Sequence, residues 1–433
     1  MTAIETRSSR AFVDNLAPVN YADVSSELRS YRSDKDGPPN AEFPYQLIAR
    51  TVQLVGKHFL PPRLLDELAL LRDEHRHESL LADFLCCVLD KHDDAYRYSS
   101  YIAFPLLAPL VAGEAPRLRP VHLAGLLVAD AIRFELGALH SWHDRLPERR
   151  PGAAMVRKRA RHGLRHLVRS GQMVSSPELF ELAGHIDDAQ RASELLDVLP
   201  APETADVALR LDASVLPVYV LHDEYLFIRV LQSYEAVFTA LIGYVRDARN
   251  ALRSGQPKQA AARIADATNC LDSAGQLFSL LATMSNVAFR IFRQFTEGAS
   301  AIQSEHYKKF ELICCAPPLN RLRSAAFDNV PLVQAEAQAK PDTIAGAYLG
   351  ELAADRLSPA EDRALLHAVA ELEHSHQRWK ATHHSLAARM LGDAPGSGYT
   401  VGVPYLRACL DNRLFWQLEA VARTKGVPDV AGA

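Results

Sequence analysis

Two adjacent histidines, His383 and His384, lie in a stretch whose apolar residues recur at helical spacing. Trp379 precedes His383 by four residues, so these two side chains would lie on the same face of a helix. Gly392 stands where a glycine commonly ends a helix, and residues 396–402 contain three further glycines. A backbone of this kind can come close to a flat ligand. A histidine on an apolar helix face beside such a loop has the properties of an axial ligand to haem iron.

The histidine by itself leaves a second interpretation open, because a helix histidine is more commonly a structural core or surface residue than a ligand. The order of the surrounding residues is more specific than the histidine. W-x-x-x-H is followed by an arginine six residues later, a glycine three residues after that, and then G-S-G and Y-L-R. This order resembles the C-terminal motif of tryptophan 2,3-dioxygenases. The matching residues are Trp379, His383, Arg389, Gly392, Gly396, Ser397, Gly398, Tyr405, Leu406 and Arg407.

Three further blocks resemble the same family, so that the resemblance covers roughly residues 203–420. Their order and their spacing both match the family. They are H-D-E-x-L-F-I at 222–228 with Gln232 and Glu235 after it, T-M-S-x-x-x-F-x-x-F-R at 283–293, and A-S-x-x-Q-S at 299–304.

The resemblance implies a pocket for haem b in which His383 is the proximal ligand of the iron. Trp379 would hydrogen-bond the other ring nitrogen and so fix the tautomer of the histidine. His384 points about 100° further round the helix and should not compete for the metal. Ser300 and Ala301 would lie against the haem, and Ala301 replaces a family glycine that leaves more room there.

The resemblance also implies a binding site for an amino acid. Arg293 matches the family's carboxylate-binding arginine, whose planar guanidinium can hold a carboxylate through two hydrogen bonds. Ser397 takes the position of a family threonine that meets the same head group, and Phe227 and Phe289 would form an apolar slot for the ring. The alternative for Arg293 is a surface ion pair with Glu297, four residues further on.

Several positions depart from the family pattern. Leu231 stands where typical tryptophan dioxygenases have a distal histidine, so we assign no acid–base catalytic residue and expect Leu231 to line a drier substrate pocket. Ala205 and Ala208 align with a Y-x-x-Y pair, so two tyrosine rings should be missing. These changes favour an altered substrate or reaction. They do not require loss of activity, since the related indoleamine 2,3-dioxygenases also lack the histidine.

The composition is that of an ordinary globular protein. The chain has 433 residues, is 48% apolar and carries a formal charge of −4, which gives no argument for a nucleic-acid or membrane-surface partner. The six cysteines form no zinc or haem-attachment pattern, so reduced thiols in a cytoplasmic protein are expected. We also expect neither a signal peptide nor a membrane span.

The apolar periodicity predicts an all-α fold, with long helices over 222–251, 259–295, 305–314 and 360–391. Prolines near residue 200 suggest a boundary between a helical N-terminal domain of unknown role (1–200) and the dioxygenase-like haem domain (201–433). The eight Lys and Arg residues of 149–169 are expected on a solvated helix face or linker, in preference to a phosphate site.

We therefore expect a haem-dependent oxygenase that uses O₂ to di- or mono-oxygenate tryptophan or a related aromatic amino acid. Its variant pocket fits natural-product biosynthesis. The family also implies a homo-oligomer, although the long N-terminal part is available to replace intersubunit contacts at the pocket. The alternatives are a haem-binding sensor or scaffold without turnover, and a helical protein that has lost its haem.

Overall fold

The computed structural model describes residues 19–33, 43–77, 79–392, 396 and 401–426, and these residues are almost entirely helical. Within these ranges, β-pairing is limited to one isolated bridge between Glu148 and Leu221. The predicted all-α fold is therefore confirmed.

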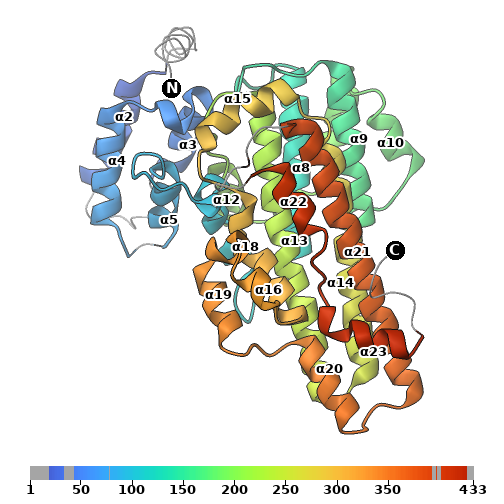
Figure 1. Ribbon diagram of the computed structural model, residues 1–433. Helices are drawn as coiled ribbons and strands as arrows, with labels where there is room; N and C mark the ends of the chain where they lie inside the picture. The colour runs from blue at the N-terminus through green and yellow to red at the C-terminus, as the bar shows by residue number, and fades with distance from the viewer. Residues whose placement is uncertain (1–18, 34–42, 78, 393–395, 397–400, 427–433) are drawn as a thin grey trace.

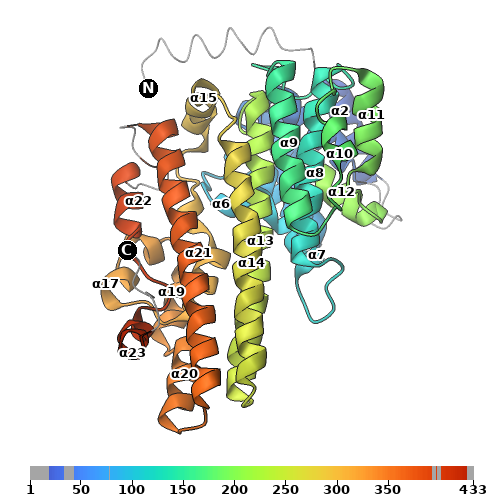
Figure 2. The ribbon, with the colours of Figure 1, turned by 90° about the vertical axis from the view of Figure 1, so that its right-hand side faces the viewer.

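Three long helices lie side by side and form the body of the molecule (Figures 1 and 2). They are α13 (His222–Arg253), α14 (Pro257–Leu281) and α21 (Pro359–Leu391), with α14 in contact with both of the others. α8 (Pro120–Leu139) packs against α13, and α9 (Ala153–Arg169) packs against α8 and α14. α13 is apolar and long enough to cross a bilayer by composition, but it is mostly buried in the structure, as expected of a core helix.

The ends of α21 follow from local sequence signals. At its start, the Ser358 hydroxyl accepts a hydrogen bond from the Glu361 N–H, and the Glu361 carboxylate accepts one from the Ser358 N–H at 3.1 Å. At its end, Gly392 has a φ of +58°, which favours glycine. The helix predicted over 360–391 is thus confirmed, and α16 (Glu305–Cys314) agrees with the predicted 305–314.

The single helix predicted over 259–295 is wrong, because the chain turns between α14 and α15 (Asn286–Thr296). The Ser285 hydroxyl caps α15 by accepting from the Ala288 N–H at 3.4 Å. The Ser285 N–H donates to the Asp223 carboxylate of α13 at 2.7 Å. This turn fixes the start of α15 against the central helix.

Shorter helices complete the fold. In the first half they are α2 (Tyr21–Ser33), α3 (Tyr45–Val55), η1 (Lys57–Phe59), α4 (Pro62–Glu74), α5 (Ser79–Val88), α6 (Tyr98–Tyr101), η2 (Phe104–Leu106), α7 (Ala108–Val111), α10 (Pro177–Leu182), α11 (Ala189–Val198) and α12 (Ala205–Ala213). In the second half they are η3 (Ala301–Gln303), α17 (Leu319–Leu322), α18 (Ala325–Asp328), α19 (Pro331–Gln338), α20 (Ile344–Ala353), α22 (Val403–Cys409), η4 (Trp416–Leu418) and α23 (Glu419–Thr424).

Two main hydrophobic cores hold these elements. The larger core takes buried residues from Tyr98 to Ala422 and therefore draws on both sides of residue 200. The smaller core contains residues of α2, α3, α4 and α5, which pack against Ala213 and Leu216. The domain boundary near residue 200 stays a prediction.

One residue of the basic stretch 149–169 does not face solvent. Arg159, on α9, is only 2% exposed and forms ion pairs with Glu135 of α8 at 2.6 Å and Asp223 of α13 at 2.5 Å. Arg165, on the same helix, is exposed as predicted. The prediction of a solvated face is wrong at Arg159 because α9 is amphipathic and this position lies on its inner side.

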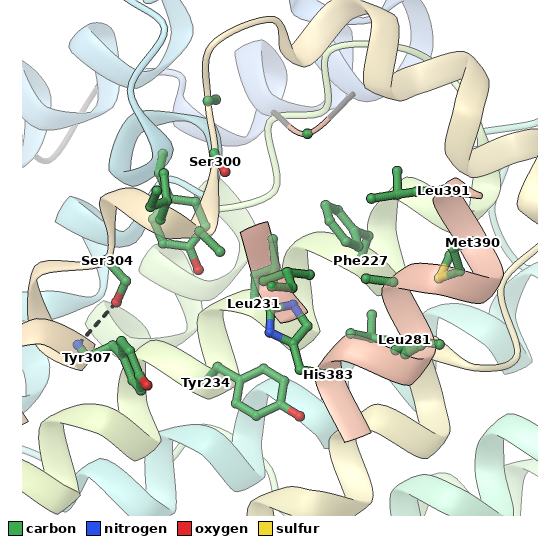
Figure 3. Close-up of a pocket in the computed structure, with 18 of the residues that line it drawn as sticks. Phe227, Leu231, Tyr234, Leu281, Ser300, Ser304, Tyr307, His383, Met390 and Leu391 are labelled. Carbon is green, nitrogen blue, oxygen red and sulfur yellow. Dashed lines mark hydrogen bonds between the residues drawn. The ribbon is translucent and has the colours of Figure 1, made fainter. Parts of the chain in front are cut away.

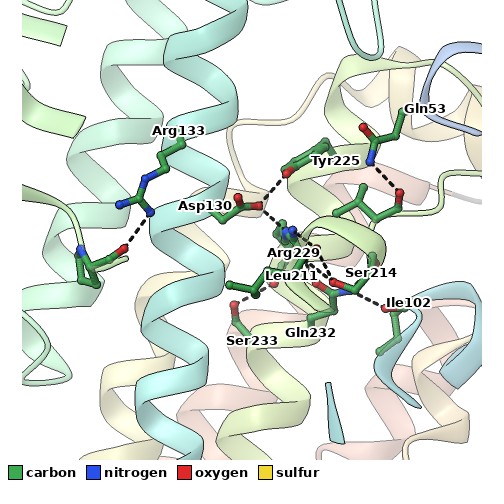
Figure 4. Close-up of polar contacts among 12 residues, drawn as sticks. Gln53, Ile102, Asp130, Arg133, Leu211, Ser214, Tyr225, Arg229, Gln232 and Ser233 are labelled. Carbon is green, nitrogen blue, oxygen red and sulfur yellow. Dashed lines mark hydrogen bonds and ion pairs between the residues drawn. The ribbon is translucent and has the colours of Figure 1, made fainter. Parts of the chain in front are cut away.

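A buried polar network joins α13 to both halves of the chain (Figure 4). The Arg229 guanidinium pairs with Asp130 of α8 at 2.6 Å. The Gln232 amide donates to the Ile102 carbonyl at 2.6 Å and to the Ser214 carbonyl at 2.8 Å. Ile102 directly follows α6, so Gln232 fixes that short helix against α13. These two hydrogen bonds explain why a glutamine stands at position 232, shortly after the motif at 222–228.

Candidate functional site

A cavity of about 270 Å³ lies in the second half of the fold, with walls from α13, α14, α15, α16, α21 and α22. Figure 3 shows several of the side chains around it. All predicted site residues that the structure describes line this one cavity. They are His383, Trp379, Ser300, Ala301, Arg293, Phe227, Phe289 and Leu231. Ser397 lies outside the described residues.

The His383 ring is directed into the cavity beside Leu231 (Figure 3). It lies parallel to Phe278 with ring centroids 5.8 Å apart. Burial, together with the nearby His384, lowers the pKa of His383 to about 4, so the ring is neutral at pH 7. Neither ring nitrogen forms a hydrogen bond with the residues that the structure describes. The site therefore presents a neutral imidazole that can bind a metal.

Trp379 does not form the predicted hydrogen bond with His383. The two ring centroids are 5.6 Å apart and the rings are tilted by 48°, while the buried Trp379 Nε1 interacts with the Tyr234 hydroxyl. The indole instead packs in an aromatic cluster, 5.4 Å from the Tyr307 ring and 5.8 Å from the Phe238 ring. In this structure Trp379 positions α21 by packing.

The C-terminal end of α21 is tied to the turn between α14 and α15. The Arg389 guanidinium donates to the Ala282 carbonyl at 3.0 Å, and the Asn286 amide donates to the Arg389 carbonyl at 3.3 Å. Gly396 and Gly402 both line the cavity, and Gly402 has a φ of +74°. These contacts explain why an arginine and glycines follow the histidine in the motif.

Arg293 enters the cavity from α15, next to a group of aromatic rings. Its side chain is half-buried, and burial lowers its pKa below the usual value for arginine. Phe227 meets Phe289 edge to face at 5.6 Å and lies 5.3 Å from Phe292. The structure thus brings a guanidinium and an apolar slot into the same wall, as the sequence predicted.

The expectation that the cavity lacks two tyrosine rings is wrong. Tyr98 and Tyr101, from α6 in the first half of the chain, line the cavity. Ala205 and Ala208 lie on α12 and are not among the lining residues. The segment 98–101 reads Y-S-S-Y, so it has the Y-x-x-Y spacing that the alignment with Ala205 and Ala208 lacks. This spacing is the sequence signal from which the two tyrosines could have been predicted.

α6 and η3 are joined by one glutamine. The Gln303 side-chain oxygen accepts hydrogen bonds from the Tyr98 N–H at 2.8 Å and the Ser300 N–H at 3.3 Å. The Tyr101 hydroxyl is 3.4 Å from the Glu224 carboxylate. Burial raises the pKa of Glu224 to about 8. Residues from the first half are therefore part of the same structural unit as Ser300 and Ala301.

A buried charged cluster, which sequence analysis missed, lies in another part of the cavity wall. Lys308 and Arg321 pair with Glu311 at 3.0 Å and 2.5 Å. Lys380 donates to the Cys409 carbonyl at 2.9 Å, and burial lowers its pKa to about 8. Because these charged groups pair with one another or with backbone carbonyls, the cluster stabilises the fold.

The described residues fit a haem. His383 offers a neutral ring without a hydrogen-bond partner in the described chain, and the other walls are largely apolar. Small residues at 299–301 and the glycines at 396 and 402 line the same cavity, so the backbone can lie close to a flat macrocycle. His384 is not among the lining residues, in agreement with His383 as the ligand.

Comparison with known proteins gives relatives from one family, although no family model matches the chain. The chain is 25% identical over 235 residues to tryptophan 2,3-dioxygenase of Pseudomonas aeruginosa (strain UCBPP-PA14), covering 46% of this chain and 82% of the relative. It is 29% identical over 230 residues to tryptophan 2,3-dioxygenase of Nocardioides sp. (strain ATCC BAA-499 / JS614), covering 46% and 85%. The chain is therefore a distant member of the tryptophan 2,3-dioxygenase-like superfamily.

Proposed function

We propose that the chain is a haem-dependent oxygenase that acts on tryptophan or a related aromatic amino acid. The observation that carries this proposal is that a neutral His383 and the Arg293 guanidinium line one apolar cavity. The first residue could hold haem b and the second could hold a substrate carboxylate. The relatives are tryptophan 2,3-dioxygenases, which supports tryptophan, or a close analogue, as the substrate class.

The residues that line the cavity have separate roles in binding the substrate. Arg293 binds the carboxylate through paired charge-assisted hydrogen bonds, and Phe227 and Phe289 hold the aromatic ring. Leu231 keeps its part of the wall apolar and excludes water. Bound haem would supply the iron at which O₂ is activated. Because Leu231 offers no acid or base, its position is compatible with the insertion of either one or two oxygen atoms.

Arg293 separates this proposal from a haem sensor without turnover. A gas sensor needs no group that recognises an amino-acid head, whereas an oxygenase for amino acids does. Tyr98 and Tyr101 also complete the cavity wall from within one chain, so that this part of the site needs no partner subunit.

We predict that Arg293→Leu weakens binding of L-tryptophan or L-tyrosine roughly 30- to 100-fold, or about 2–3 kcal/mol, because the carboxylate loses its charged partner. Haem content should hardly change. The measurement is the shift of the haem Soret band on titration with the amino acid, compared with its decarboxylated amine. Arg290→Leu is the matched control, since Arg290 is exposed on the same helix and does not line the cavity. Equal affinity of the unmodified protein for acid and amine would refute the role of Arg293.

A further inference from the structure

The chain leaves α15 through a tight turn that forms part of the cavity wall. The Ala299 N–H donates to the Thr296 carbonyl at 3.1 Å and closes this turn. Thr296, Ala299 and Ser300 all line the cavity. The Thr296 hydroxyl donates to the Arg293 carbonyl at 2.9 Å, so the turn is bonded to the segment that carries the guanidinium. The placement of Arg293 therefore depends on how this turn is held.

The turn contains one strained residue. Glu297 has a φ of +50° and a ψ of −116°, a backbone conformation that glycine adopts readily and that other residues adopt only at a cost. Such conformations persist where the surrounding structure holds them, and they are common at functional sites. The Glu297 carboxylate interacts with the hydroxyl of Tyr96, which precedes α6. A contact with the first half of the chain therefore accompanies the strain.

Lys91, in the same part of the first half, contacts the backbone of the turn. Its ammonium group donates to the Thr296 carbonyl at 3.3 Å and lies 4.3 Å from the centroid of the Tyr96 ring. The C-terminal end of a helix such as α15 favours a positive charge of this kind. Burial lowers the pKa of Lys91 to about 8, so this amine is charged at pH 7. Lys91 therefore joins the end of α15 to a segment 205 residues earlier in the chain.

An aromatic cluster also packs against the end of α15. The Phe295 ring stacks on the Tyr219 ring with centroids 5.1 Å apart. It lies 5.3 Å from the Phe59 ring and 5.2 Å from the His58 ring, both in η1 (Lys57–Phe59). This packing holds the helix, whereas Lys91 holds the carbonyl at which the turn begins. The first half of the chain thus fixes the end of α15 by apolar contact and by charge.

We propose that Lys91 is a positioning residue through which the first half of the chain sets the affinity of the cavity for an amino-acid carboxylate, a proposal that rests on the function given above. Its ammonium group fixes the Thr296 carbonyl, and the last turn of α15 then presents Arg293 to the carboxylate. Lys91 does not line the cavity, so it acts through Arg293 and not on the ligand.

A double-mutant cycle on amino-acid binding tests this role, with the shift of the haem Soret band as the readout. We expect Lys91→Met to weaken binding of L-tryptophan or L-tyrosine about 5- to 10-fold at pH 7, the usual effect of one lost hydrogen bond. Haem content and binding of the decarboxylated amine should hardly change. Adding Lys91→Met to Arg293→Leu should cause no further loss, because the two residues act as a unit. Arg97→Met is the matched control, since Arg97 is an exposed cation of the same segment outside the cavity wall.

Three results would count against the proposal. Unchanged affinity in a folded, haem-loaded Lys91→Met protein would overturn the positioning role and leave the proposed oxygenase intact. Additive losses in the double mutant, or equal losses for the acid and the amine, would show that Lys91 only supports the fold. Failure of the unmodified haem-loaded protein to bind either amino acid would contradict the proposed function itself.

A pH series gives a second measurement that holds even where Lys91→Met does not fold. The charge of Lys91 is present below its pKa of about 8 and is lost above it, so the hold on the turn should weaken as the pH rises from 7 to 9. The titratable and charged groups around Lys91 are Lys57, His58, Asp90, Tyr96, Glu224 and Glu297. Lys91→Arg leaves these groups in place and stays charged over this range. The affinity for the amino acid should therefore fall less in Lys91→Arg than in the unmodified protein, and equal falls would contradict the proposal.

Discussion

Replacing His383 with alanine is expected to abolish stable haem binding, while His384→Ala should leave the haem spectrum nearly unchanged. The His383 ring is neutral, is directed into the cavity and forms no hydrogen bond within the described part of the chain, whereas His384 does not line the cavity. Loss of the proximal imidazole removes the direct bond between protein and iron. Titration of the apoprotein with haem, followed at the Soret band, measures the effect.

The adjacent histidine makes this comparison informative, since both variants remove one imidazole from the same helix. A His383→Ala protein that binds haem as tightly as the unmodified chain, with the same spectrum, would show that another residue is the ligand. Loss of binding in both variants would point to damage to α21 (Pro359–Leu391) and not to the iron.

The second large effect is expected on stability. Arg159→Met should lower the free energy of unfolding by about 3–5 kcal/mol, because it leaves the buried carboxylates of Glu135 and Asp223 without their shared cation. Methionine keeps most of the side-chain volume, so little of the loss should come from a cavity. Urea unfolding followed by circular dichroism measures the change.

Arg165→Met is the matched control for Arg159, since Arg165 is exposed on the same helix and should change stability by less than about 0.5 kcal/mol. Equal effects of the two substitutions would contradict the buried network. A selective effect at Arg159 would show that α9, from the first half of the chain, stabilises the central helix α13 of the second half.

Helices with strong apolar periodicity and clear end signals could be predicted from the sequence. α21 carries a capping box at its start and a glycine at its end, and its predicted bounds agree with the structure to within one residue. The turn between α14 and α15 was missed although the capping residue Ser285 is a local signal. The contact that holds this turn against α13 is not local, because it is the hydrogen bond between Ser285 and Asp223, which are 62 residues apart in the chain.

In the candidate site, too, local motifs could be predicted from the sequence and tertiary contacts could not. Residues within matching motifs, such as His383, Arg293 and Phe289, could be named from the sequence, and the structure places them in one cavity. Tyr98 and Tyr101 were missed because they reach the cavity from far earlier in the chain. Their position depends on tertiary hydrogen bonds such as that from the Tyr98 N–H to Gln303, 205 residues away, which no local pattern encodes.

This chain differs from its relatives in the part that the first half of the sequence plays in the cavity. Its relatives match 46% of its length, yet the cavity includes side chains from α6 that Gln232 and Gln303 hold in place. Leu231 makes one part of the wall apolar.

The proposed function requires that the protein oxygenates an aromatic amino acid bound in this cavity. Its most direct test is aerobic incubation of the ferrous, haem-loaded protein with L-tryptophan or L-tyrosine, with the products identified by mass. We predict a product that has gained one or two oxygen atoms from O₂, absent with His383→Ala and strongly reduced with Arg293→Leu at limiting substrate. A fully haem-loaded protein that binds the amino acid but forms no oxygenated product from either one would contradict the proposed function.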